Sequence, residues 1–294
     1  MSEFSRILCP VDFSEFSVRA LHYAVSLAQH YRAKLFVQHV VELWRYPSAG
    51  FSPGKYFDEF SQRLLQKGEE KLQELLRTAT DTEIQPEPVV QQGTAADSIL
   101  AFATSRKTDL IVMGTHGRRG FDRLMLGSVT ERVIRKAPCP VLAVRKPAHD
   151  FVVSGKQQDT VHLSRILFCT DFSENSQRAM DHAISLTEEY NAELTVLHVL
   201  EDVPDSARMA DVIAPTTERL KKLLPLEVLK PERIKTIVRI GTPYREIIQF
   251  TVEAQTDMVV MAVRGRSALD LAVFGATTHR VMQLGPCPVL AVHV

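Results

Sequence analysis

The chain has 294 residues, and its 35 Lys and Arg side chains balance 35 Asp and Glu side chains. This length suits two domains of ordinary size, and the charge balance excludes a global field that would favour DNA or an acidic membrane surface. The N-terminal segment lacks the pattern of a secretory leader, and no apolar run approaches about 18 residues. We therefore expect a cytoplasmic protein with no nucleic-acid or membrane partner, whose singly placed cysteines are reduced core residues.

Strand and helix patterns alternate along the first half of the chain. Short apolar runs predict strands at 6–11, 34–41, 88–92, 109–114 and 140–144. Apolar residues spaced three and four apart predict helices from Ser14, over 57–75, from Thr94 and from Ser128. An acidic residue follows Thr94 and Ser128 three positions later, so we expect a capping box at both helix starts. Strict alternation implies right-handed crossovers and a parallel sheet with helices on both faces.

The second half of the chain repeats the first. Residues 5–42 align without a gap on residues 164–201, with more than half of the positions identical, and residues 109–146 align on residues 257–294. Such a long period indicates a duplicated domain, because the units of solenoid proteins are only about 20–50 residues long. The fold class expected is α/β, with two tandem, Rossmann-like, doubly wound domains of five parallel strands each.

Composition suggests where one domain ends and the next begins. We expect a first domain at 1–146, a linker at 147–163 and a second domain at 164–294, because the linker segment is polar and contains Pro, Gly and Gln. The first repeat also carries an insertion at 43–57 that contains the only tryptophan of the chain. This insertion follows a strand, so it is a candidate lid or docking loop, with a loop packed over the core as the alternative.

The stretch "GTHGRRGFDRLMLGS" begins at Gly114, where the fourth strand of repeat one ends. Open parallel sheets bind ligands beyond the carboxyl ends of their strands, and Asp12 also follows a strand. Gly114 and Gly117 allow a positive φ and a close approach of backbone amides to a ligand. Gly127 and Ser128 lead into a helix whose amides and dipole favour an anion. Because the Asp12 carboxylate can accept hydrogen bonds from a base or a ribose, the two features together suit a nucleotide.

Each of these residues also has a purely structural interpretation. The glycines can be ordinary turn residues, Ser128 can cap its helix, and Asp12 can help to start the helix that follows it. His39 and His198 are expected to be core histidines with satisfied hydrogen bonds, and His116 an exposed loop residue rather than a base. The sequence contains no P-loop, no His-x-x-x-His pair and no G-x-S-x-G elbow.

The glycine turn and its surroundings resemble the universal stress protein family in a tandem, two-domain form. The family motif G-x2-G-x9-G-[ST] is matched by Gly114, Gly117, Gly127 and Ser128, and "ILCPVDFSE" and "LFVQHVVE" resemble the first two strands of the family. The resemblance implies the strand order 3-2-1-4-5. In one branch of the family it also implies bound ATP, or a related adenine nucleotide, with Mg²⁺ near the phosphates.

The resemblance also implies roles for particular residues. Asp12 and Val40 would contact the adenosine with Met113 beside them, and the motif glycines and Ser128 would hold the phosphates. Val129 is a further candidate residue for binding the nucleotide. Family members pair through their last strands, so we expect the two repeats to pair within the chain through "PVLAVRK" and "PVLAVHV". A homodimer and an unknown protein partner are further expectations.

Repeat two departs from the motif, because Ala262 and Ala276 stand where repeat one has Gly114 and Ser128. An alanine held at positive φ costs roughly 1 kcal/mol, and a lost serine hydroxyl removes a contact worth about 1 kcal/mol. We therefore predict nucleotide in repeat one and a weak or empty site in repeat two, where an anion held by the arginines of "RGR" is the alternative.

The leading functional hypothesis is an ATP-binding stress-response or regulatory protein in which the bound nucleotide biases the conformation that a partner meets. No general base with a fixed water site is evident, so hydrolysis is expected to be slow at most. Two alternatives stay open. One is a phosphoryl or nucleotidyl transferase that uses His116, Arg118 or Arg119, and the other is a dimerising scaffold in which the nucleotide is incidental.

Overall fold

The computed structural model describes residues 4–43, 55–79, 84–117, 126–145, 151–154, 159–201, 209–224, 231–263 and 275–293. The insertion at 43–57 therefore lies mostly outside the described residues, as do Arg118, Arg119 and the "RGR" segment of repeat two. Within the described ranges, no helix is both long enough and apolar enough to cross a membrane.

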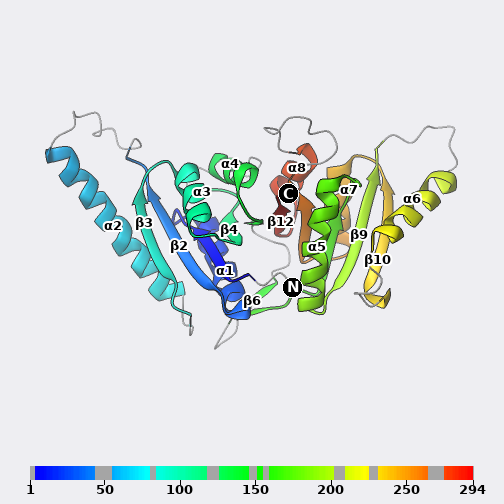
Figure 1. Ribbon diagram of the computed structural model, residues 1–294, viewed down its shortest axis with the longest axis horizontal. Helices are drawn as coiled ribbons and strands as arrows, with labels where there is room; N and C mark the ends of the chain where they lie inside the picture. Colours follow the sequence, from blue (N-terminus) through cyan, green and yellow to red (C-terminus); the bar gives the residue numbers. More distant parts are fainter. Residues whose placement is uncertain are drawn as a thin grey trace.

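The two repeats contain the same succession of elements, drawn from blue to red in Figure 1. Repeat one contains β1 (Arg6–Pro10), α1 (Glu15–Tyr31), β2 (Lys34–Val41), α2 (Lys55–Ala79), β3 (Glu87–Gln92), α3 (Ala95–Ser105), β4 (Leu110–Gly114), α4 (Ser128–Lys136) and β5 (Val141–Val144). Repeat two contains β8 (Arg165–Cys169), α5 (Glu174–Glu189), β9 (Glu193–Leu200), α6 (Met209–Leu223), the short helix η3 (Pro231–Arg233), β10 (Ile234–Ile240), α7 (Pro243–Glu253), β11 (Met258–Ala262), α8 (Ala276–Leu284) and β12 (Val289–Val292). Between the repeats lie β6 (Val152–Ser154) and β7 (Asp159–Val161).

The strand order is β10-β9-β8-β11-β12-β5-β4-β1-β2-β3 in one continuous sheet. Each half has the order 3-2-1-4-5, which confirms the expected topology, and all pairs within a half are parallel. The halves join where β5 and β12 pair antiparallel, with Leu142 opposite Leu290. This seam uses the two segments that the sequence analysis assigned to pairing of the repeats.

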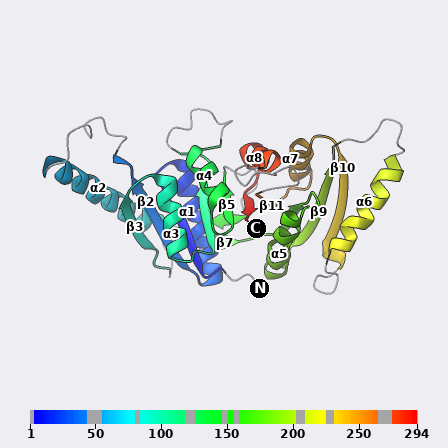
Figure 2. The ribbon, with the colours of Figure 1, turned by 45° about the horizontal axis from the view of Figure 1, so that its top comes forward.

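Helices cover both faces of the sheet, so its central strands are buried on both sides. One apolar cluster gathers residues of α1, α2, α5 and α6, and a second gathers residues of α3, α4, α7 and α8. Each cluster contains residues from both repeats. In Figures 1 and 2, α4 and α8 lie near the middle of the molecule, whereas α2 and α6 lie at its two ends. The sheet and both apolar clusters are thus shared by the two halves.

The segment at 147–163 holds more structure than a polar tether. Strands β6 and β7 pair antiparallel within it, and the buried ring of Phe151 meets the ring of Tyr23 on α1 edge-on, with centroids 4.7 Å apart. Leu163 is buried as well. A few apolar side chains among polar neighbours are sufficient to fold this connection onto α1.

The helix starts differ in part from the sequence expectations. The first helix starts at Ser14, as expected, and the Ser14 side chain caps α1 by accepting from the Ser17 amide. Thr94 is the N-cap residue of α3 but makes no side-chain capping bond. Instead, Oε1 of Glu42 accepts from the Ala95 amide at 2.9 Å. Helix α4 is capped by Gly127, which makes Ser128 its first helical residue. The capping boxes expected at these last two helices are therefore wrong.

Candidate functional site

Asp12 stands between the end of β1 and the start of α1. Its Oδ1 accepts from the amide of Ser14 at 3.0 Å and from the Ser14 hydroxyl at 2.6 Å. The next residue, Phe13, has a φ of 64°, which is rare for a bulky side chain. This left-handed residue lets the chain turn sharply from strand to helix and holds Asp12 at the strand end. The interpretation of Asp12 as a helix-starting residue is thus confirmed for one of its two oxygens.

The second oxygen of Asp12 faces the glycine turn. A Cβ atom added to Gly117 would lie 2.7 Å from Oδ2 of Asp12, closer than real Cβ contacts come. Since β1 and β4 are neighbours in the sheet, their carboxyl ends place the carboxylate beside the α-carbon of Gly117. The structure therefore brings together the two features that the sequence assigned to one crevice.

Neither Gly114 nor Gly117 adopts a positive φ, so the sequence argument based on backbone conformation was wrong. Among the described glycines, only Gly93 and Gly241 have one. Gly114 is needed for space, because a Cβ atom there would lie 2.8 Å from the backbone carbon and oxygen of Phe16 at the start of α1. The first turn of α1 lies directly against the end of β4.

Three hydrogen bonds join the ends of the turn to the sheet. The Thr115 amide donates to the Val144 carbonyl at 2.9 Å, and the Gly127 amide donates to the Thr115 carbonyl at 2.8 Å. The Thr130 hydroxyl donates to the Gly114 carbonyl at 2.8 Å. These bonds fix the N-terminus of α4 beside the end of β4. The first amides of a helix have no acceptor within it, so this end of α4 offers donors to an anion.

Ser128 and Val129 occupy the first turn of α4. The Ser128 side chain is exposed and does not cap the helix, which removes the structural interpretation that the sequence left open for its hydroxyl. Val129 is half-buried against the apolar cluster of α3 and α4. Thr130 was not identified from the sequence, although a threonine in the first turn of a helix after a glycine turn is a usable signal.

Val40 and Met113 lie on the strands that flank β1. Met113 is buried in the cluster beneath α3 and α4. Val40 is half-buried and follows Phe36 of the same cluster by four residues, so both point to one face of the sheet. The structure thus places these two residues on one face, with the end of β1 between their strands.

The histidines of this region are structural. Nδ1 of His39 donates to the Val11 carbonyl at 2.8 Å, and Nδ1 of His198 donates to the Thr170 carbonyl at 2.7 Å in repeat two. Both expectations of satisfied histidines are confirmed. His116, expected to be exposed, is instead 5% exposed, with Nδ1 2.9 Å from the Thr115 hydroxyl and its ring 5.0 Å from that of Phe16. The close packing of the turn on α1 buries it.

Repeat two retains the frame of the site. Oδ1 of Asp171 accepts from the Ser173 amide at 3.0 Å, and Phe172 has a φ of 63°. The Thr278 hydroxyl donates to the Ala262 carbonyl at 3.0 Å. Ala262 has no positive φ, so the strain expected there does not arise.

The cysteines and the possible metal ligands are the remaining candidate groups for chemistry. All four cysteines are buried and free, which confirms their interpretation as core residues. Burial raises the pKa of both the Cys139 and Cys287 thiols to about 12. No group of three or more His, Cys, Asp or Glu side chains is placed to hold a metal ion among the residues that the structure describes.

A doubly wound parallel sheet, with a strand-end aspartate facing a glycine turn that opens a helix, defines the class of α/β domains that bind ligands where the strand order reverses. The chain belongs to the universal stress protein family, whose model matches residues 3–145 and 162–293. A universal stress protein of Methanocaldococcus jannaschii is 35% identical over 144 residues, which cover 49% of this chain and 84% of that protein.

A solved structure shows the same fold over nearly the whole chain. A universal stress protein from Archaeoglobus fulgidus has a TM-score of 0.67 and 24% identity, and the match covers 99% of this chain and 97% of that one. A universal stress protein solved in complex with cAMP has a TM-score of 0.38 and 20% identity, and the match covers 45% of this chain and 98% of that one.

Proposed function

We propose that repeat one binds ATP, or a closely related adenine nucleotide, at the carboxyl ends of β1 and β4. The observation that carries the proposal is the approach of Asp12 Oδ2 to Gly117, next to the N-terminus of α4. The Asp12 carboxylate only accepts hydrogen bonds, so it suits ribose hydroxyls or the base amine. The exposed Ser128 hydroxyl and the free amides of α4 suit the phosphates.

Apolar residues on the strands that flank β1 and in the first turn of α4 suit the adenine ring. Met113 is buried, and Val40 and Val129 are half-buried, all on the side of the sheet covered by α3 and α4. The proposal assigns Val40 and Met113 to the adenosine, as the family resemblance implies, and Val129 is a further candidate contact of the nucleotide. Repeat two keeps Asp171 but lacks Gly114 and Ser128 equivalents, so we assign it a weak or empty site.

Mg²⁺ is proposed to enter together with the phosphates. The described residues offer no cluster of protein ligands, and Mg²⁺ commonly keeps several waters and binds through substrate phosphates. The proposal assigns no proton transfer to His116, which is buried between Thr115 and Phe16. Hydrolysis is therefore expected to be far slower than about one turnover per second, which is the lower end of the usual range for enzymes.

The biological role proposed is regulation of an unidentified protein partner in the cytoplasm, with nucleotide occupancy as the signal. No catalytic base is assigned, so the proposal gives the nucleotide the role of a ligand that shifts the protein between conformations. A ligand shifts such an equilibrium only as far as it binds one conformation more tightly than the other. Partner binding should therefore differ between the protein with saturating ATP and the protein without nucleotide.

A pair of matched substitutions tests the site. Asp12 and Asp171 make the same bond to the start of a helix, but only Asp12 is assigned to a nucleotide. Asp12→Asn should weaken ATP binding about tenfold, or about 1.4 kcal/mol, because an amide replaces a charged acceptor. Asp171→Asn should leave the affinity within about twofold. Isothermal titration of the full-length chain with Mg-ATP measures both affinities and is expected to give one site.

Two results would contradict the proposal. One is a wild-type protein that binds no adenine nucleotide, and the other is an equal loss of affinity in both variants. Titration with cAMP, the ligand of one solved relative, compares the nucleotides directly: tighter binding of cAMP would assign the site to a cyclic nucleotide.

A further inference from the structure

The C-terminal ends of α1 and α5 meet where the two repeats join. The sequence alignment of the repeats places His30 on Glu189 and Tyr31 on Tyr190, so these four residues are two pairs of equivalent positions. Here they are called the junction cluster. Nε2 of His30 donates to Oε1 of Glu189 at 2.8 Å, which links the last turn of one helix to the last turn of the other.

Aromatic contacts surround this bond. The His30 ring stacks on that of Tyr190 with centroids 4.6 Å apart and an interplanar angle of 24°. The Tyr31 and Tyr190 rings meet edge-on at 6.2 Å. Burial raises the pKa of Tyr31 to about 12 and also raises that of Tyr190. The cluster therefore combines a solvent-accessible bond between His30 and Glu189 with tyrosine rings that pack between the repeats.

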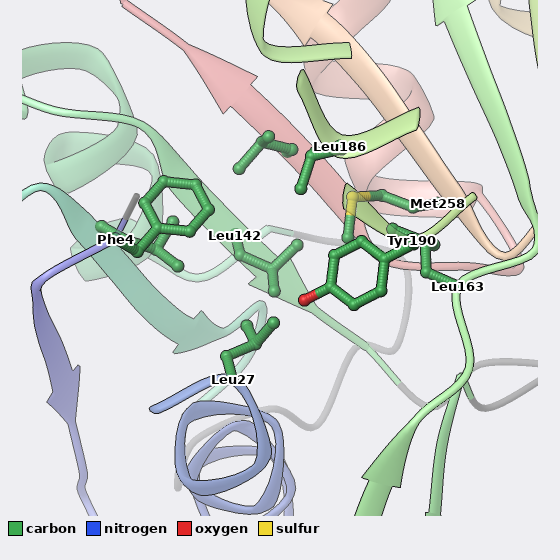
Figure 3. Close-up of a pocket in the computed structure, with 9 residues that line it drawn as sticks. Phe4, Leu27, Leu142, Leu163, Leu186, Tyr190 and Met258 are labelled. Carbon is green, nitrogen blue, oxygen red and sulfur yellow. The ribbon is translucent and has the colours of Figure 1, made fainter. Parts of the chain in front are cut away.

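The junction cluster borders a small apolar pocket at the interface. Figure 3 shows side chains from both halves around it: Phe4, Leu27 and Leu142 come from repeat one, and Leu186, Tyr190 and Met258 come from repeat two. The helices and the sheet seam thus form one continuous interface.

The interface has a local two-fold symmetry. Leu142 pairs with its own equivalent, Leu290, and the flanking pairs of β5 and β12 are reciprocal. In a symmetric contact of this kind, residues close to the two-fold axis meet their own copies, and the equivalent positions 30 and 189 meet here. Two copies of repeat one would bring His30 to His30, and two copies of repeat two would bring Glu189 to Glu189. Only the pairing of unlike repeats gives an imidazole opposite a carboxylate.

We propose that the junction cluster selects the pairing partner: repeat one recognises repeat two of the same chain and disfavours a second copy of itself. His30 and Glu189 keep 32% and 40% of their side-chain surface exposed, so their attraction alone is modest. Specificity arises from the alternatives, in which two carboxylates repel each other or two imidazoles meet without a carboxylate acceptor. The chain is in this sense a heterodimer made of one polypeptide.

A charge-exchange experiment on the full-length chain tests this role. His30→Glu should lower Tm by about 2–4 °C, because it places two carboxylates at the junction, and Glu189→His should also lower it. The variant with both substitutions restores an unlike pair in reverse, so it should recover most of the loss. Differential scanning calorimetry of the four proteins gives the coupling between the two positions.

Co-refolding measures the selection of partners itself. Each single variant is mismatched within its own chain, but repeat one of either variant matches repeat two of the other. An equimolar mixture refolded from urea should therefore contain at least about twofold more dimer, measured by light scattering, than either variant refolded alone.

An exchange of Arg178 and Glu174 is the control, since this ion pair lies within α5. It should change neither coupling across the junction nor the dimer fraction. Losses of Tm that simply add in the exchanged variant, or a mixture with no more dimer than its components, would overturn the proposal. None of these readouts depends on nucleotide binding.

Discussion

The two repeats differ by a single methyl group at the position of Gly114, which is Ala262 in repeat two. A side chain at this position would press on the Phe16 backbone, whereas repeat two carries Ala262 in a strand of the same length and burial. In repeat one, the first turn of α1 packs directly on the end of β4 and leaves no room for a methyl group at this position.

Gly114→Ala should lower the free energy of unfolding by about 1–3 kcal/mol, the cost of forcing an extra methyl group into a packed site. The reverse change in repeat two, Ala262→Gly, should cost less than about 1 kcal/mol, since it removes a methyl group and adds backbone freedom. Urea denaturation of both variants measures the two costs, and equal values would contradict the steric explanation.

The sequence predicted the importance of this glycine but gave the wrong reason. Spacing and residue type mark a glycine turn, but the distance between β4 and α1 depends on tertiary packing that no local pattern contains. The same limit explains His116, which was expected to be exposed because it stands between polar and glycine residues. Asp12 and Gly117 were predicted to meet because parallel strands end at the same edge of a sheet, which is a property of topology.

At the scale of elements, α4 is held by a contact that spans the glycine turn. The Thr130 hydroxyl binds the Gly114 carbonyl, and Thr278 makes the equivalent bond to Ala262. In both repeats the N-cap residue is a glycine, which has no side chain to accept a capping hydrogen bond. The position of each site helix therefore depends on this threonine more than on a cap.

Thr130→Val and Thr278→Val should each lower the free energy of unfolding by about 1–3 kcal/mol, because a buried carbonyl loses its donor. Only Thr130→Val should also weaken ATP binding, since only α4 is assigned to phosphates. Chemical denaturation and calorimetric titration separate the two effects. An equal effect of both variants on ATP affinity would show that α4 holds no phosphate.

Helix starts were the least predictable elements for a physical reason. The start of α1 at Ser14 was predicted from the apolar spacing, and its capping partner, Ser17, is local. The Ala95 amide is capped by Glu42, which is distant in sequence and comes from the end of β2. A local capping box cannot reveal such a donor–acceptor pair, whereas the strands were well predicted because burial on both faces produces continuous apolar runs.

At the scale of the whole molecule, one ten-stranded sheet runs through both repeats, and side-chain contacts cross its seam in both directions. Arg145, after β5, donates to the Gln283 carbonyl near the end of α8 at 2.6 Å. His293, after β12, contacts the Ile134 carbonyl near the end of α4. Each repeat therefore supports the C-terminal end of the other repeat's site helix, where a basic side chain also complements the helix dipole.

Alkaline pH should weaken the interface between the repeats. The pKa of Tyr31 is about 12 in the folded chain, against about 10 for an unperturbed tyrosine. The neutral phenol is thus favoured by folding, so its contribution is complete below about pH 10 and is lost as pH rises towards 12. Tyr31→Phe should make the stability less dependent on pH in this window.

Urea denaturation at pH 8 and pH 11 measures this dependence for wild type and variant. Tyrosinate absorbance of the folded protein provides an independent titration of the phenols. If Tyr31→Phe loses as much stability at alkaline pH as the wild type, the pH dependence comes from a group other than Tyr31.

The seam between β5 and β12 consists of backbone pairing, and this has an evolutionary consequence. In a homodimer every substitution appears twice, once on each side of the axis, so a residue that disables one site disables both. Fusion of the two copies makes each substitution count once. Ala276 could thus replace a serine in one half while the other half kept it, and the sheet remained closed because main-chain hydrogen bonds do not depend on side chains.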